Sequence, residues 1–149
     1  MTSQRHRART HALQALFEID ETDHTPERVV AHHIDAYLLT GEIEQFLRHL
    51  VFGVWGQRQF LDQTIASVAS SWPIQQMPGV DKAILRVAVF ELLIDGPAHT
   101  PVRVVIDEAV ELAKQFGGDH SGRFINGVLG TIVTRYIESS RADDGASAS

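Results

Sequence analysis

Three arginines crowd the first eleven residues, at positions 5, 7 and 9, with no acidic residue among them. A guanidinium group binds phosphate oxygens through two parallel hydrogen bonds, so Arg5, Arg7 and Arg9 could anchor a phosphate-bearing ligand. They also begin a helical pattern, and the N-terminal end of a helix disfavours each exposed cation by about 0.3–1 kcal/mol. Helix stability therefore does not explain them. Phosphate binding explains the three arginines. The alternative is an N-terminal segment that is only solvated and binds nothing.

The chain as a whole is acidic, because its 149 residues carry a formal net charge of −6 in spite of the basic start. An acidic body repels an extended polyanion, which argues against a general duplex binder. A short single-stranded RNA that touches a limited surface fits this charge distribution better. Proteins recognise such RNA through aromatic stacking and base edges as well as through phosphates.

Eight histidines raise the question of a metal site. His32 and His33 are adjacent, so on a helix their side chains diverge by about 100° and do not easily share one ion. Glu42, Glu44 and His49 fall on one predicted helix, but the Glu-x-x-His pairs that a di-metal bundle needs on two helices are absent. The chain also has no cysteine, and we therefore expect no metal.

Asp119, His120 and Ser121 are the residue types of a hydrolase triad. Side chains adjacent in sequence on a turn cannot pass a proton along a line, because such triads depend on spatial geometry. Capping of the next helix by Asp119 or Ser121 is the simpler explanation. The nearby glycines also lack the Gly-Lys-Ser/Thr ending of a phosphate-binding loop. The sequence indicates neither an enzyme nor a bound cofactor.

The elements that position these residues are predicted to be helices, about seven of them, in an all-α fold. Thr-Pro pairs mark helix starts at 25–26 and 100–101. An apolar stripe continues past Gly56, which indicates a kink or a short break there. On the last predicted helix, Gly127 and Gly130 are spaced to allow a close helix contact.

The first helix carries an apolar stripe at Leu13, Leu16 and Phe17. On a helical wheel, Arg5 and Arg9 fall on the same side as the two leucines. Toward the start of the helix, arginines thus take the place of leucines on this side. We therefore expect the first turns to project beyond the core and to be free to meet a ligand.

The run 80–94 is apolar almost all round and predicts a central buried helix; within it, the apolar stretch 83–94 is interrupted by Arg86 and Glu91. It is too short and too interrupted to span a bilayer. The segment ALQALF is shorter than a typical signal-peptide apolar region and is followed by Glu18, so no secretory signal is visible. The default expectation is a cytoplasmic protein with no membrane contact.

The stretch 70–80 contains two prolines and predicts a link between two small helical-bundle subdomains. The first subdomain spans residues 1–71 and contains the arginine-rich start, and the second spans residues 72–140. The tail 141–149 is small and polar, and we expect it to be disordered.

Three stretches, RHRARTHALQALFE, MPGVDKAILRVAVFELL and PVRVVIDEAVELAKQFGGDHSGRFINGVLG, resemble in order and spacing the signature stretches of the NusB family of bacterial transcription antitermination factors. The resemblance covers about residues 4–138, and the last stretch is the most specific. It implies two helical subdomains, no catalysis, and a role in ribosomal RNA transcription. Such factors pair with the small-subunit ribosomal protein NusE, bind the boxA element of nascent RNA, and help RNA polymerase resist termination. Some members are monomers and others homodimers, so a homodimer is possible.

The resemblance also implies which residues contact or influence RNA. These are Arg5, His6, Arg7, Arg9, Phe17, Asp81, Asp119, His120 and Ser121. Two positions depart from the common pattern. Phe17 lacks the hydroxyl of the tyrosine often found there, and we expect it to pack in the core with the Leu13–Leu16 stripe. His120 stands where some relatives have an acidic residue, which could make RNA affinity pH-dependent.

Two other functions remain open at the level of sequence. One is a helical protein–protein adaptor with no direct RNA contact, in which the partner makes every RNA contact. The other is a helical domain like those attached to RNA methyltransferases, but these 149 residues leave no room for a methyl-donor domain. An RNA-binding antitermination factor remains the leading hypothesis.

Overall fold

The computed structural model describes residues 3–140, and every regular element in that range is helical. The helices are α1 (Gln4–Glu21), α2 (Pro26–Tyr37), α3 (Gly41–Gly56), α4 (Arg58–Val68), a 3-10 turn η1 (Ile74–Gln76), α5 (Gly79–Val89), a π-helical turn η2 (Phe90–Asp95), α6 (Val102–Phe116), α7 (Ser121–Ile132) and a second π-helical turn η3 (Val133–Glu138). The predicted all-α fold with about seven helices is confirmed. The tail 141–149, predicted to be disordered, lies outside the described residues.

Side-chain caps begin the first two helices. The Ser3 hydroxyl accepts the His6 backbone N–H (3.0 Å), and the Thr25 hydroxyl accepts that of Arg28 (3.2 Å), as the Thr-Pro pair predicts. The same prediction fails at Thr100. Its side chain is buried, Pro101 occupies the N-cap position of α6, and the Thr100 hydroxyl lies 3.4 Å from Nη1 of Arg5. A tertiary donor thus takes the place of the local cap.

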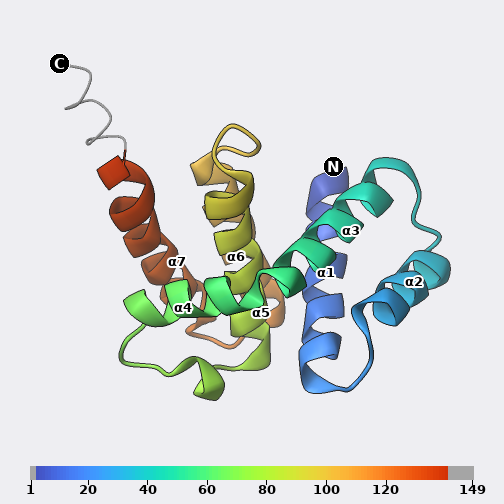
Figure 1. Ribbon diagram of the computed structural model, residues 1–149, viewed down its shortest axis with the longest axis horizontal. Helices are drawn as coiled ribbons and strands as arrows, with labels where there is room; N and C mark the ends of the chain where they lie inside the picture. The colour runs from blue at the N-terminus through green and yellow to red at the C-terminus, as the bar shows by residue number, and fades with distance from the viewer. Residues whose placement is uncertain (1–2, 141–149) are drawn as a thin grey trace.

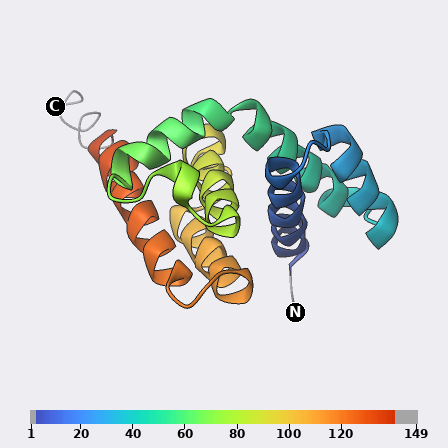
Figure 2. The same ribbon diagram turned by 90° about the horizontal axis from the view of Figure 1, so that it is seen from below.

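The helices form two groups (Figures 1 and 2), and α5 packs against members of both. The first group contains α1, α2 and α3, and α1 packs against both of its companions. The break predicted near Gly56 is confirmed, since α3 ends there and α4 begins at Arg58. Although α4 follows α3 directly, it packs against α5 and α7. The subdomain boundary after residue 71 stays a prediction.

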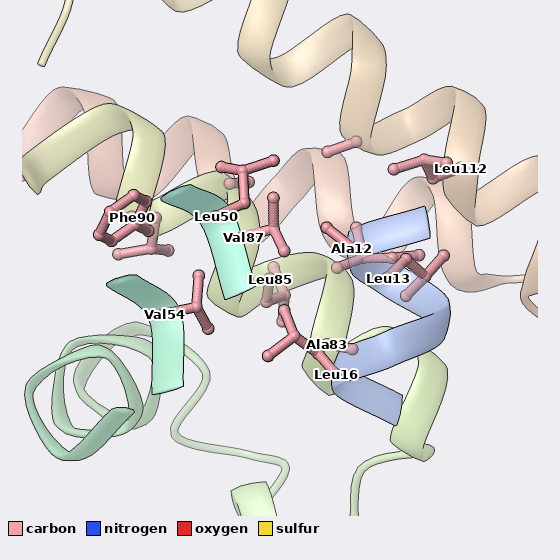
Figure 3. Packing of buried hydrophobic residues seen from close by; sticks show 14 of the residues in the cluster. Ala12, Leu13, Leu16, Leu50, Val54, Ala83, Leu85, Val87, Phe90 and Leu112 are labelled. Atoms are coloured by element: carbon pink, nitrogen blue, oxygen red, sulfur yellow. The ribbon is translucent and has the colours of Figure 1, made fainter. Parts of the chain in front are cut away.

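The core lies where α5 meets the other helices (Figure 3). The residues from Ala83 to Phe90 are all buried, which fits the predicted central helix. Leu16 of α1, Leu50 of α3 and Leu85 of α5 are each no more than 1% exposed. Among the described residues, no helix combines the length and the apolar character needed to cross a membrane.

Arg86, one of the two charges that interrupt the apolar run, ties three helices together. Its guanidinium donates two hydrogen bonds of 2.7 Å to Asp62 of α4 and a longer one of 3.4 Å to Asp20 of α1. Lys82 adds a second cation 2.7 Å from Asp20. A bidentate arginine–carboxylate pair fixes direction as well as distance, so this cluster sets how α4 and the end of α1 lie on α5.

The prediction of a close helix contact at Gly127 and Gly130 is wrong. Both glycines are exposed on α7, and a Cβ added at either would meet no atom within 4 Å. The buried side of α7 is formed by Ile125, Leu129 and Ile132. A spacing of three keeps both glycines on one face, and here that face is the solvent side.

Two buried histidines join α1 to α2. Nδ1 of His11 lies 3.3 Å from Nδ1 of His33, and the Tyr37 ring packs against both imidazoles, with centroids 4.7 and 5.8 Å away. One nitrogen must donate and the other accept, so a proton on both breaks the contact. Burial lowers the pKa of both imidazoles, and a nearby Arg7 charge lowers that of His11 further. In residues 3–140 no group of three metal-binding side chains gathers.

We expect acid to weaken this contact. The lowered pKa of His11 and His33 means that the unfolded chain binds more protons than the folded chain as the pH falls below about 6.5, so the free energy of unfolding decreases there. Urea unfolding at pH 7.5 and 5.5, compared between the wild type and His33→Gln, measures the effect. The variant should lose part of the pH dependence. Equal pH dependence in both proteins contradicts the assignment.

Candidate nucleic-acid interface

The four basic residues at the start of α1 point into different surroundings. Arg7 is exposed and has no acidic partner among residues 3–140. The side chains of Arg5 and His6 are 39% and 25% exposed, whereas that of Arg9 is only 3% exposed. The first turns therefore do not project from the core as a unit. The helix presents Arg7 to solvent, leaves Arg5 and His6 at the margin, and buries Arg9.

Arg9 forms an internal ion pair with Glu91 of η2. Its Nε and Nη2 donate hydrogen bonds of 2.8 and 2.7 Å to the two carboxylate oxygens, and both side chains are buried. Burial alone would lower the pKa of Arg9, but the hydrogen bonds and charge of Glu91 outweigh it and raise the pKa. The expectation that Arg9 is free to meet a ligand is wrong. The side of α1 that carries Leu13 and Leu16 stays buried as far as Arg9, and only Arg5, one turn earlier, reaches solvent.

Arg5 holds only long contacts at the surface. Its Nε lies 3.4 Å from Glu42, its Nη1 lies 3.4 Å from the Thr100 hydroxyl, and its guanidinium carbon lies 4.8 Å from the centre of the Phe46 ring. An exposed ion pair of this kind contributes about 0–1 kcal/mol, so a phosphate can replace Glu42 at little loss. His6 Nδ1 pairs with the Glu108 carboxylate of α6 at a half-exposed site.

Phe17 does not pack in the core, contrary to the prediction. Its ring is 39% exposed, because the leucines at 13 and 16 fill the space against the neighbouring helices and Phe17 lies one step further round α1. One edge of the ring lies close to Gly79, where an added Cβ would come within 2.8 Å of Cε2. The free face borders a hollow between α1 and α2 that Tyr37 also lines. Phe17 is thus available for stacking.

Asp81 and Ser121 form an internal link between α5 and α7. The Ser121 hydroxyl donates a 2.8 Å hydrogen bond to Asp81 and accepts the backbone N–H of Gly118 (3.0 Å). Both side chains are buried, and burial raises the pKa of Asp81 although the hydrogen bond from Ser121 opposes the shift. Neither residue is placed for direct contact with RNA. They fix the turn 117–120 against the start of α5.

Asp119 and His120 lie exposed on that turn. The N-cap position of α7 is His120, whose side chain makes no capping hydrogen bond, and Ser121 is already inside the helix. The prediction that Asp119 or Ser121 caps α7 is therefore wrong. The Ser121 hydroxyl instead accepts the Gly118 backbone N–H of the preceding turn and donates to the buried Asp81. Of the three neighbours, only Asp119 and His120 can meet a ligand in solution.

The arginine-rich start is held in place by three residues with no predicted role, Glu91, Glu108 and Phe46. One signal for Glu91 is present in the sequence. It is a carboxylate in a run that is apolar almost all round, and such a group needs an internal cation. No comparable signal identifies Glu108 or Phe46, because their contacts join segments that lie far apart in the chain.

Comparisons with known proteins agree with this architecture. The model of the NusB family matches residues 6–134. The transcription antitermination protein NusB of Chloroflexus aggregans is 55% identical over 144 residues, which cover 97% of this chain and 96% of that protein. The structure of T. maritima NusB superposes with a TM-score of 0.83 at 28% identity, covering 96% of this chain and 99% of that one.

A chain in a crystal structure of the antitermination factors NusB and NusE with double-stranded RNA has the same fold. Its TM-score is 0.81 at 23% identity, and the match covers 91% of this chain and 100% of that one. Family model, sequence relatives and fold all agree. The chain belongs to the NusB family of transcription antitermination proteins.

Proposed function

We propose that this protein is an RNA-binding antitermination factor that works with NusE and contacts RNA through the exposed start of α1. The observation that carries the proposal is the state of Arg7 and Arg5. Arg7 is solvated with no acidic partner in the described chain, and Arg5 is 39% exposed with two long hydrogen bonds of 3.4 Å. Two guanidinium groups are thus ready to bind phosphate without the loss of a strong internal interaction.

Further contacts are proposed at three places. His6 can add a donor once its imidazole leaves Glu108, and the exposed ring of Phe17 offers a surface for base stacking. Asp119 and His120 form a third contact at the turn before α7. Arg9 acts as a positioning residue: its pair with Glu91 fixes the start of α1 and so the direction in which Arg7 points.

The biological setting is also part of the proposal. It comprises boxA RNA in a nascent ribosomal transcript, the RNA polymerase antitermination complex, and a cytoplasmic location. A homodimer that covers the arginine surface until NusE or RNA binds is compatible with the exposed position of Arg7. The family consists of transcription antitermination factors, and the proposal assigns this chain no catalytic step.

The test compares an Arg5→Gln, Arg7→Gln double variant with the wild type in a titration of labelled boxA RNA. We expect about a tenfold loss of affinity for each lost contact, because a hydrogen bond to a charged group contributes about 1.5–3 kcal/mol. The matched control is Arg28→Gln, Arg58→Gln, which removes the same charge from exposed positions on α2 and α4. The control should bind like the wild type.

The titration is repeated with NusE and with both single-stranded and duplex RNA. Duplex is included because the similar NusB–NusE complex contains double-stranded RNA. If the double variant binds both RNAs as the wild type does in the presence of NusE, the protein-only adaptor is correct and direct RNA contact by α1 is rejected.

A further inference from the structure

A cluster of one aromatic and two imidazole rings lies beside Arg5 at the edge of the core. The rings of Phe46, His49 and His99 are mutually stacked, with centroids 5.9–6.1 Å apart and interplanar angles of 16–28°. Phe46 and His49 come from α3, and His99 comes from the loop before α6. Phe46 is buried, but the side chains of His49 and His99 are 45% and 37% exposed.

A buried carboxylate orients His49 and lies near His99. Asp95, whose side chain is only 8% exposed, lies 2.8 and 2.9 Å from Nε2 of His49 through its two oxygens. The second oxygen also lies 3.9 Å from Nδ1 of His99. Nδ1 of His99 is instead 3.3 Å from the Thr100 hydroxyl, so each imidazole has a polar partner that restricts its ring. The rings are therefore held in a fixed stack at the surface.

The open side of this stack faces a shallow hollow of about 210 Å³. It is lined by Arg5, Glu42, Gln45, Phe46, His49 and His99. Arg5 covers the Phe46 ring from the neighbouring helix, and Gln45 presents an amide that can both donate and accept hydrogen bonds. Three rings, one cation, one carboxylate and one amide thus surround a single small space, and Arg5 stands beside the Glu42 carboxylate as its counter-charge.

We infer that this hollow is a nucleobase subsite for single-stranded RNA, in which one base stacks on the imidazoles of His49 and His99. Single-stranded RNA is held by stacking of unpaired bases on aromatic, histidine and arginine planes, and by hydrogen bonds to base edges. Gln45 supplies the edge contact, and Arg5 holds the adjoining phosphate. The inference rests on the proposed function, because it needs RNA at the start of α1, and it adds a base contact that the arginines do not provide.

The experiment measures affinity for single-stranded boxA RNA with the full chain. The double variant His49→Ala, His99→Ala should bind RNA about tenfold more weakly than the wild type, since the loss of one base-stacking contact typically weakens binding by about that factor or more. His49→Phe, His99→Phe keeps the ring surfaces and should bind within about threefold of the wild type. The control, Phe60→Ala, Tyr136→Ala, removes two exposed rings from α4 and η3, outside the proposed RNA contacts, and should have no effect.

A series of RNAs, each lacking one base, locates the contact. The wild type should lose affinity at one nucleotide, and the alanine variant should be insensitive to removal of that same base. The slope of affinity against salt should be equal in the two proteins, because no phosphate contact is lost. A smaller slope in the alanine variant indicates a phosphate in the hollow and overturns the inference.

Two outcomes separate this inference from the proposed function. If the Arg5→Gln, Arg7→Gln variant loses affinity while the alanine histidine variant binds every RNA as the wild type does, the base subsite is rejected and the proposed function stands. If neither variant changes RNA affinity, both are rejected. Each variant is first compared with the wild type by circular dichroism and urea unfolding, and the phenylalanine variant provides the test if the alanine variant is unfolded.

Discussion

An Arg9→Met variant should lose about 3–5 kcal/mol of unfolding free energy, the largest effect expected of any single substitution considered in this chain. The change leaves the Glu91 carboxylate buried with neither of its two charged hydrogen bonds. Removal of one partner destabilises the protein by more than the intact pair stabilises it. The remaining buried charge keeps its desolvation penalty and loses the attraction that offset it. Urea unfolding followed by far-UV circular dichroism measures the loss.

Two controls identify the cause. Arg7→Met makes the same chemical change at an exposed position of the same helix and should alter the free energy of unfolding by no more than about 0.5 kcal/mol. Arg9→Met, Glu91→Leu removes both charges and should recover most of the lost stability. An Arg9→Met variant as stable as the wild type but weak in RNA binding would show that Arg9 contacts RNA directly.

Leu85→Ala is expected to lower the free energy of unfolding by about 2–5 kcal/mol. Leu85 is completely buried on α5, the helix that packs against both groups, and truncation leaves a cavity there (Figure 3). Leu38→Ala is the matched control, because the same side chain at position 38 is 83% exposed. The control should change stability by less than about 0.5 kcal/mol.

The two tryptophans allow the same variant to test whether the helix groups unfold together. Trp55 reports from α3, and Trp72 packs against Phe124 of α7 with ring centroids 4.8 Å apart. Because α5 joins the groups, single-tryptophan variants (Trp72→Phe and Trp55→Phe) should show coincident urea transitions, both shifted by Leu85→Ala. A shift at only one tryptophan contradicts the central role of α5 and favours independent subdomains.

Much of the helical organisation follows from local signals. The cap at Thr25, the break after Gly56 and the buried run of α5 each depend on residues close in sequence, and each is present in the structure. The cap at Thr100 is not, because a donor from α1 reaches its hydroxyl. A local rule fails here where a distant side chain competes for the same group.

The depth of a charged side chain is harder to predict. A helical wheel correctly places Arg9 on the apolar side of α1. The wheel does not show whether that side is still buried at position 9 or already exposed to solvent. The answer depends on Glu91, which lies 82 positions further along the chain. Arg86 and Glu91 both interrupt the apolar run, and both have bidentate partners from other helices. Charges inside such a run are therefore signals of internal pairs.

The residues of the candidate site also differ in how far the sequence predicts their role. Residue types and the family resemblance indicate which positions matter, but burial separates contact from support. Arg5, Arg7, Asp119 and His120 reach solvent, whereas Asp81 and Ser121 hold the turn from inside. Phe17 lies at the surface because its neighbours on α1 fill the core. Such assignments require the packing of whole helices, which no short stretch of sequence specifies.

The salt dependence of RNA binding tests the central claim, that Arg5 and Arg7 are phosphate contacts, most directly. Each phosphate contact on a single strand contributes about 0.7 to the slope of log affinity against log salt concentration. For Arg5→Gln, Arg7→Gln the slope should therefore be smaller in magnitude than that of the wild type by about 1.4, with the helical content unchanged. An unchanged slope in a correctly folded double variant contradicts the claim.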